Sequence, residues 1–413
     1  MLKKISIFFF LGAIQILSAQ NNINSPYSLF GLGIENQIAT GGLVGMGNSG
    51  VAQRTYNEIN LFNPANLGNI MPESFLQDFG LNGLYSVLKN NDTNQSTTKG
   101  NVSHLAFAFP VARGWGVSLG ILPYTTTGYE IDVEGNVEGY PATYTTSYVG
   151  SGGLNKFFVS SGYKINKRLS VGVDFAVLFG TLIQETQIIS SYIVDIYDQN
   201  HYNGLKLTTG VQYDVFQSDK NRTTLGATIE LPTVLSGDQN RSSYKTTSLG
   251  GQIEIEENTA TTLDDFELPL SIGIGVSSAF RKFTTNLDYK RVFWNNTDQK
   301  LNDGRYTDQS IYAFGLEYVK ENKNASFFRL LKYRFGVNYN TGMLNVSNEQ
   351  IESRFVSVGL GFPISRTGKD SFNFSYSYGT EGTVNHNLIQ ENYHKISINL
   401  SFNGSWFKKA KIL

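Results

Sequence analysis

Runs of alternating apolar and polar residues are the feature that most constrains the fold of this chain. In residues 371–378 the even positions are aromatic, and the odd positions are serine or asparagine. Residues 356–362, 396–402, 268–277 and 169–177 show the same period of two. That period places apolar residues on one face of a strand and polar or small residues on the other. Helix periodicity fits none of these segments, so the sequence predicts an all-β fold.

The lengths of the connections decide which kind of β-protein to expect. The connections after the second, fourth, sixth, eighth and twelfth strands are brief and the one after the tenth is somewhat longer, whereas those after odd strands are long and polar. Short turns at one end and long loops at the other are typical of a transmembrane antiparallel β-barrel, here of about fourteen strands. A β-sandwich has no reason to place every long loop at one end. The expected strands are 75–89, 100–110, 114–127, 145–163, 168–188, 202–217, 222–232, 267–280, 282–293, 309–320, 331–341, 353–364, 371–379 and 392–403, and the expected long loops are 90–100, 128–144, 189–201, 232–266, 295–309, 342–352 and 380–391.

The first residues have the pattern of a secretory signal peptide. Lys3 and Lys4 precede an apolar stretch, 5–17, that is too short to span a bilayer as a helix. We expect residues 1–19 to be removed between Ala19 and Gln20 and the mature chain to reside in the bacterial outer membrane. The mature chain has no apolar run long enough for a transmembrane helix, so it would cross the membrane as strands. A retained N-terminal anchor and a secreted soluble β-protein are the alternatives.

Composition excludes several classes of function. The chain has no cysteine, which excludes a lipoprotein anchor, disulfides and a thiol nucleophile. Its 33 basic residues are scattered among 34 acidic ones, so it lacks the basic surface that nucleic-acid binding requires. The chain is instead rich in glycine, tyrosine and phenylalanine and poor in charge, with only 16% charged residues, as a barrel wall with aromatic girdles requires.

The residues of a catalytic, cofactor or metal site are missing. The four histidines have no metal-ligand spacing with one another or with a carboxylate. The glycine-rich stretch 149–153 lacks the Lys-Ser/Thr of a phosphate-binding loop, so Gly152 and Gly153 are interpreted as a kink in a strand. An outer-membrane lipase or protease is the enzyme alternative, but no nucleophile is placed near a base. We therefore predict a protein that is not an enzyme and has no cofactor or metal.

Charged residues within the predicted strands occupy the positions that alternate with the apolar residues, on the polar face of each strand. Facing lipid they would be very costly, so they are expected to line the lumen and to pair across it. A specific ion or substrate path is the less favoured reading of the same residues. The predicted lumen-facing residues are Asp174, Asp214, Glu230, Asp288, Lys290, Glu317 and Arg334.

Residues 20–73 differ from the rest of the chain. Their density of glycine and proline predicts turns rather than strands, and a fourteen-stranded barrel, 74–413, is too wide for its own side chains to fill. Residues 45–52 followed by 61–67 resemble the glycine-rich element and the Asn-Pro-Ala motif in the N-terminal hatch of the FadL family of outer-membrane transporters, and both ends of the chain resemble a subgroup of FadL-like barrels. The resemblance implies passive uptake of hydrophobic small molecules, such as long-chain fatty acids, through a lumen plugged by residues 20–73. The implied hatch and gate residues are Gly45, Gly47, Gly50, Asn63, Pro64 and Ala65.

Three functions remain open at this point. A transporter predicts a continuous apolar pocket beside the hatch, which would release its solute at the bend around 63–65 or through the wall at Gly152 and Gly153. A scaffold or shuttle subunit of a protein secretion or assembly complex, similar to that of type IX secretion, predicts exposed apolar segments that dock a partner. A structural, porin-like barrel predicts ion conductance. The expected partners are accordingly outer-membrane lipid and either a hydrophobic small molecule or another protein, but not nucleic acid.

Overall fold

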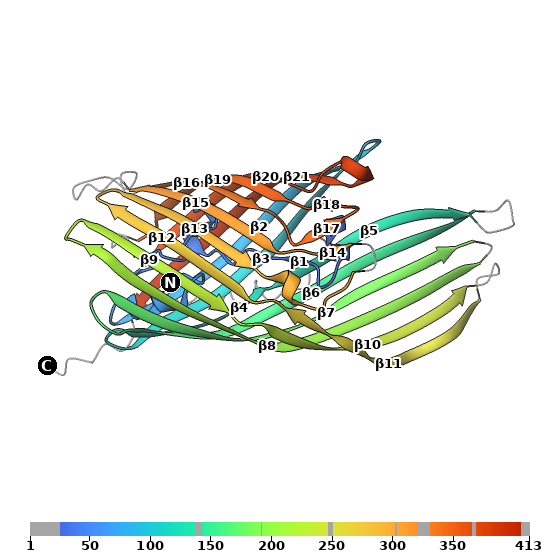
Figure 1. The fold of residues 1–413 in the computed structure, drawn as a ribbon, viewed down its shortest axis with the longest axis horizontal. Helices are drawn as coiled ribbons and strands as arrows, with labels where there is room; N and C mark the ends of the chain where they lie inside the picture. The colour runs from blue at the N-terminus through green and yellow to red at the C-terminus, as the bar shows by residue number, and fades with distance from the viewer. Residues whose placement is uncertain are drawn as a thin grey trace.

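A computed structural model describes residues 25–136, 143–190, 192–246, 251–301, 304–319, 331–365 and 369–405. These residues form a closed antiparallel β-barrel (Figure 1), in which the first wall strand, β2, pairs with both the next strand, β3, and the last, β21. The ring has fourteen positions, which confirms the predicted fold class and strand number. The predicted signal peptide 1–19 and the cleavage site at Gln20 lie outside the described residues.

The wall follows chain order, and at three positions two successive strands share one place in it. β4 is continued by β5, β9 by β10, and β11 by β12. The wall strands are β2 (Ser74–Lys89), β3 (Asn94–Ala112), β4 (Trp115–Pro123), β5 (Thr125–Asn136), β6 (Thr143–Lys164), β7 (Leu169–Ile189), β8 (Ile193–Gln217), β9 (Asn221–Glu230), β10 (Thr233–Thr246), β11 (Gln252–Leu268), β12 (Ser271–Phe280), β13 (Phe283–Val292), β15 (Gln309–Val319), β16 (Lys332–Asn340), β19 (Ser353–Pro363), β20 (Ser371–Glu381) and β21 (Gln390–Ser405). The remaining elements are β1 (Ile34–Glu35), β14 (Arg305–Tyr306), β17 (Leu344–Val346), β18 (Glu349–Gln350) and the 3-10 helices Pro26–Leu29, Gly41–Met46, Pro64–Asn69, Trp294–Asn296 and Asn385–Asn387.

Three of the predicted long loops are wrong, and a fourth, 90–100, is wrong from residue 94 onward, where β3 begins. Over 128–144, 189–201 and 232–266 the structure has strand hairpins, formed by β5 with β6, β7 with β8, and β10 with β11. β8 beyond residue 197 and much of the β10–β11 hairpin are polar on both faces. They lack the apolar face that reveals a half-buried strand in a sequence, and backbone pairing holds them together instead. On β5, Tyr129, Ile131 and Val133 do alternate with carboxylates, and the prediction of a loop over 128–144 overlooked this short run.

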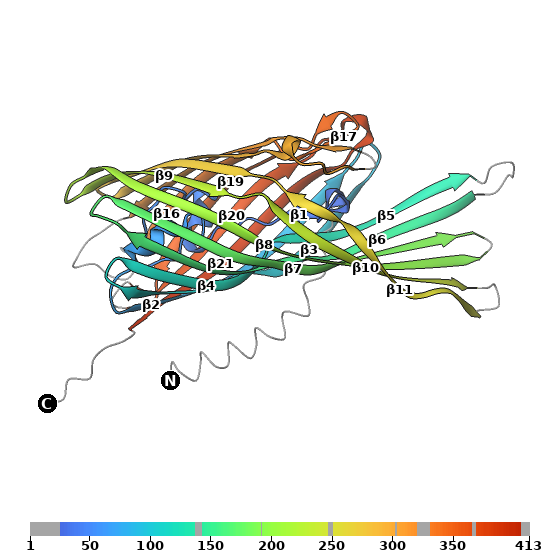
Figure 2. The same cartoon turned by 60° about the horizontal axis from the view of Figure 1, so that its bottom comes forward.

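The hairpins build a sheet that projects beyond the rest of the barrel, on the right in Figures 1 and 2. β8 has 25 residues and would extend about 85 Å, whereas a membrane crossing needs only about 9–11 residues. The sheet extends from the end opposite the short turns, which is the extracellular end of such barrels. We call it the projecting sheet: 127–136 of β5, 143–152 of β6, 182–189 of β7, 193–203 of β8, 236–246 of β10 and 252–265 of β11.

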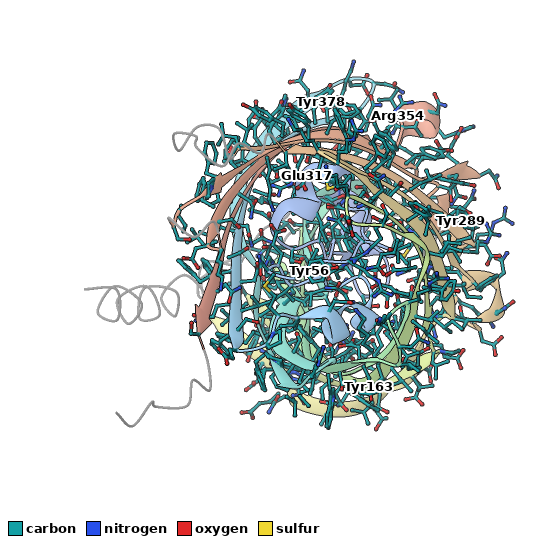
Figure 3. The ribbon with its side chains drawn as sticks, turned by 90° about the vertical axis from the view of Figure 1, so that its left-hand side faces the viewer. Tyr56, Tyr163, Tyr289, Glu317, Arg354 and Tyr378 are labelled. Carbon is teal, nitrogen blue, oxygen red and sulfur yellow. The ribbon has the colours of Figure 1, made fainter. Side chains whose placement is uncertain are left out.

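The outer surface of the barrel carries the apolar residues that lipid requires. Tyr163 and Tyr378 lie on the outside of the ring in the end view of Figure 3 and are about half exposed. Aromatic side chains pair at the two ends of the apolar band, for example on β13 and β15, as the aromatic girdles of outer-membrane barrels do. No helix in the described part of the chain is long and apolar enough to cross a membrane.

Candidate functional site

The segment 25–73, which we call the hatch, runs through the inside of the barrel (Figure 3). Its 3-10 helix Gly41–Met46 packs against β15, β16, β19, β20 and β21, and its 3-10 helix Pro64–Asn69 packs against β4, β6, β7 and β8 on the opposite side. The hatch therefore joins two sides of the wall in the half of the barrel near the short turns.

Asn63 attaches the hatch to strands β8 and β9. Its side chain is fully buried, and its Nδ2 donates to the carbonyls of Val51, Val211 and Ala227 at 2.9, 3.0 and 3.3 Å. Its Oδ1 accepts from the Ala65 N–H at 3.0 Å, which caps the helix that Pro64 begins. The Asn-Pro-Ala motif thus fixes both a bend in the hatch and its position on the wall.

Asp288 of β13 holds the glycine-rich element of the hatch. Its Oδ2 accepts from the N–H groups of Gly50 and Val51 at 2.6 and 3.0 Å. The carboxamide of Gln212, on β8, donates to the Val51 carbonyl at 3.1 Å. Two strands that are separated in the ring only by β9 and β12 therefore hold the same turn of the hatch.

Gly47 marks the third attachment, on β16 and β19. Its N–H donates to Ser357 Oγ at 3.1 Å, and its carbonyl accepts from Asn338 Nδ2 at 3.0 Å. Its φ of +67° is a left-handed conformation that favours glycine. A Cβ on the facing Gly336 would overlap the Gly47 nitrogen, so this pair of glycines permits direct approach of hatch and wall backbones.

Arg54 is a buried cation that the motif analysis missed. Its guanidinium lies 3.1 Å from the Asp214 carboxylate and donates to the carbonyls of Arg168 and Gln212 at 2.7 and 3.0 Å and to Asn69 Oδ1 at 2.9 Å. Burial lowers the pKa of Arg54, against the opposing effect of Asp214. The only signal for Arg54 in the sequence was the scarcity of charge around it, because residues 25–73 contain just four charged side chains, Glu35, Arg54, Glu58 and Glu73.

Glu58 forms the matching ionic contact on the other side of the ring. Its carboxylate lies 2.8 Å from Lys332 Nζ and 3.9 Å from Arg334 Nη2, and Arg334 also donates to Glu317 at 2.7 Å. Burial alone would raise the pKa of Glu58, but the two cations outweigh burial and lower it to about 2. The hatch is thus held by ion pairs at two sides of the lumen.

The lowered pKa of Glu58 predicts how hatch docking depends on pH. A lowered pKa contributes stability that is present above the ordinary value of 4.5 and is lost as the pH falls toward about 2. We expect constant protection of the hatch from protease between pH 5 and 8 and a loss worth roughly 3 kcal/mol below that range. Limited proteolysis at each pH measures this protection. In Glu58→Gln the decrease in protection at acid pH should be smaller. An equally steep loss of protection at acid pH in that variant would show that another group is responsible.

A cavity of about 730 Å³ lies between the hatch and the extracellular mouth. Leu61, Phe62 and Leu67 of the hatch line it together with wall residues. Charged residues line it as well, and three ion pairs lie in this lining: Lys156–Asp174 at 2.6 Å, Lys206–Glu230 at 2.9 Å and Lys290–Glu230 at 2.6 Å. The pocket is therefore mixed in character rather than continuously apolar.

An apolar cluster lies beside this cavity, and several of its residues also line the cavity. The rings of Trp294 and Tyr306 stack at 4.5 Å, and Phe266 packs edge-on against both. Tyr27 of the hatch belongs to the same cluster and donates from its hydroxyl to the Ile389 carbonyl at 2.6 Å. The start of the hatch thus packs together with the loops that join β13 to β15 and β20 to β21.

Gly152 and Gly153 occupy the position in β6 where its partner changes from β4 to β5. Both have positive φ, +105° and +143°, and both approach neighbouring backbone closely. At the same level β1 of the hatch pairs with Thr125 and Thr126 of β5. The predicted kink position is therefore a junction in the wall that the hatch covers.

The structure places the predicted lumen residues together with the hatch, not in one catalytic cluster. Asp214 and Asp288 contact the hatch directly, Arg334 lies beside Glu58, and Glu317 lies inside the ring (Figure 3). Asp174 and Lys290 form ion pairs above it. In the described part of the chain no group of three or more His, Asp or Glu side chains is arranged to hold a metal ion.

The family model described as BamG matches residues 1–412. The chain belongs to the BamG family. Among curated proteins none matches this BamG-family chain significantly.

Solved structures share the fold of this BamG-family barrel. The toluene transporter TodX of P. putida covers 91% of the chain with all of its own length, at 14% identity and a TM-score of 0.63. The CymD monoaromatic hydrocarbon channel covers 91% with all of its length, at 19% identity and a TM-score of 0.59. A FadL homologue of Pseudomonas aeruginosa covers 90% with all of its length, at 12% identity and a TM-score of 0.63.

These likenesses confirm the FadL-like fold that the hatch motifs implied. They place the chain among outer-membrane-type barrels, as the strand pattern predicted. By their descriptions, two of these neighbours are a toluene transporter and a monoaromatic hydrocarbon channel, and the third is a FadL homologue.

Proposed function

We propose that this BamG-family barrel is a plugged outer-membrane scaffold that presents its projecting sheet to partner proteins in an assembly or secretion complex. The observation that carries the proposal is the combination of a lumen occupied at two levels with a long β-sheet beyond the membrane. The lumen supports a structural role, and the sheet supplies a surface for a partner.

The lumen favours a structural role on energetic grounds. The hatch is fixed by buried hydrogen bonds and ion pairs on both sides of the ring, for example at Asn63 and Arg54. A hydrocarbon entering the cavity would have to lie against Lys156, Lys206 and Lys290 and their carboxylate partners. Displacing water from charged groups without replacing its hydrogen bonds is costly, so the lining disfavours such a ligand.

The projecting sheet has the chemistry of an exposed docking surface. It contains twelve carboxylate side chains and two cationic ones, although the whole chain has a net charge of only −1. Val133, Ile253 and Ile255 on it are 50%, 55% and 60% exposed. Charge segregation of this kind steers oppositely charged partners, and exposed apolar groups provide contact area.

Passage of hydrophobic small molecules, fatty acids included, is the second candidate. It is favoured by the cavity that touches the hatch and by fold neighbours whose descriptions name toluene and monoaromatic hydrocarbons. In that function the bend at Asn63–Ala65 is the gate, or the junction at Gly152 and Gly153 is the exit through the wall.

Native mass spectrometry of the barrel purified from its own membrane in mild detergent separates the two functions. The scaffold predicts a stoichiometric partner protein, which is lost when the β10–β11 hairpin is shortened while the barrel stays folded. It also predicts no ion conductance in planar bilayers, because the lumen is plugged. A co-purifying fatty acid or hydrocarbon that disappears in Asn63→Ala with Pro64→Ala, in a barrel without a partner protein, would establish transport instead.

A further inference from the structure

β11 has an open edge. Its residues pair with β10 along the whole strand, from Leu268 opposite Thr233 to Gln252 opposite Thr246. Among the described residues no second strand pairs with it, whereas β12, which continues it, pairs with both β9 and β13. The backbone N–H and C=O groups along 252–264 that do not point toward β10 therefore have no strand partner, which is the template for adding another strand.

All of the charged side chains on this edge are negative. The part of β11 within the projecting sheet carries Glu254, Glu256, Glu257, Asp264 and Asp265 and no cationic residue. In the described structure no salt bridge joins these five carboxylates to a cation. The two cations of neighbouring β10 are engaged elsewhere.

The contacts of the two β10 cations, Arg241 and Lys245, show why these residues do little to neutralise the carboxylates of β11. Arg241 donates to both oxygens of Asp198, on β8, at 2.7 and 2.8 Å. The Lys245 ammonium lies 3.9 Å from the centre of the Tyr192 ring. Both therefore make these contacts on the side of the sheet that leads away from β11. The hydrogen bond to Asp198 raises the pKa of Arg241 most, and the Glu256 carboxylate has only the smallest of the effects that raise it.

The opposite edge of the projecting sheet provides a comparison. β5 also carries three carboxylates, Glu130, Asp132 and Glu134. Its first residues are covered by the hatch, since β1 pairs with Thr125 and Thr126 and the backbone of Gly128 is bonded to Ser28. The β11 edge is longer, and its Ile253 and Ile255 are more exposed than any apolar side chain on β5.

We infer that the open edge of β11 binds an extended, lysine- and arginine-rich segment of a partner protein, which adds to the projecting sheet as a further strand. Main-chain hydrogen bonds would provide the attachment, the carboxylates would select a basic segment, and the two isoleucines would contact its apolar residues. The inference rests on the proposed scaffold function and specifies the chemistry of its partner.

Two short fluorescent peptides test the inference on the full barrel in detergent at physiological salt. One alternates lysine with valine, and the other alternates lysine with proline, so that the charge is equal and only the first can form a strand. Anisotropy should show about tenfold tighter binding of the valine peptide. Equal binding of the two peptides would reduce the interaction to charge alone and overturn the inference.

Matched variants locate the binding edge. Replacing Glu254, Glu256 and Glu257 by glutamine should weaken the valine peptide about tenfold, as expected for the loss of several exposed charge pairs. The control replaces Glu130 and Glu134 by glutamine and Asp132 by asparagine on β5, and should change affinity about twofold or less. An equal loss in the two variants would contradict a site on β11.

Cross-linking gives a readout that does not depend on these charges. Because the chain has no cysteine, one introduced at Ile253, Ile255, Thr259 or Thr261 is unique. A peptide with one cysteine should form a disulfide with these β11 positions in a fixed register. It should form none with a cysteine introduced on β5 instead. Cross-linking without register would overturn strand addition. A partner protein found by mass spectrometry with no peptide bound to β11 would leave the scaffold standing and refute only this inference.

Discussion

Replacing Asn63 by leucine will detach the hatch from β8 and β9, at a cost of about 3 kcal/mol in the free energy of docking. The leucine side chain has a similar size, but it removes the donor to three backbone carbonyls and the acceptor for the Ala65 N–H. A buried polar group left without a partner costs about 1–3 kcal/mol.

Proteolysis and conductance measure this release. The hatch of the variant should be cleaved in intact barrels under conditions in which the unaltered hatch is protected. The unplugged lumen should conduct ions in planar bilayers, because fourteen strands enclose more space than their own side chains fill. Asn94→Leu, at an exposed position on β3, is the matched control. If the hatch of Asn63→Leu stayed protected from protease and the bilayer showed no ion conductance, Asn63 would not be needed to hold the hatch in place.

Replacing Arg334 by methionine will lower the free energy of unfolding by about 3–5 kcal/mol. Only 1% of the Arg334 side chain is exposed, and it donates to Glu317 at 2.7 Å and to Asn373 Oδ1 at 2.8 Å. Methionine leaves the Glu317 carboxylate buried without its cation and removes the charge beside Glu58. Denaturant unfolding followed by tryptophan fluorescence measures the loss.

Two further variants separate this effect from a change in packing. Glu317→Gln added to Arg334→Met should recover part of the lost stability, because the remaining partner is then neutral. Lys332→Met should cost about 1 kcal/mol or less, since a third of the Lys332 side chain is exposed and its pair with Glu58 is partly screened by water. A larger loss for Lys332→Met than for Arg334→Met would refute the ranking by burial.

The wall of the barrel could be predicted from the sequence because lipid and the lumen impose opposite requirements on alternate residues. Phe372, Phe374 and Tyr376 alternate with polar residues on β20, and the same phase places Asp174 and Asp288 on the inner side of their strands. The brief turns and the strand number followed from the same pattern. Within the hatch, the local chemistry of Asn63 and Pro64 was sufficient to predict a bend.

Most of the projecting sheet could not be predicted, because its strands meet water on both faces. Without an apolar face, residues 193–201 and 236–265 have the composition of polar loops, and only pairing with neighbouring strands shows that they are extended. The open edge of β11 is a property of that pairing. It became visible only when the neighbours of every strand were known.

The sequence by itself determined the barrel, its number of strands, the sides on which its charges lie and the presence of a segment that is not part of the wall. Only the tertiary structure decided how that segment is held. Glu58 meets Lys332 across 274 positions of the chain, and Asn63 reaches strand carbonyls 148 and 164 residues away. Alternation within a strand is a local pattern that solvent imposes on each residue, whereas these contacts depend on where ring closure and hatch docking place distant backbones, which no local pattern records.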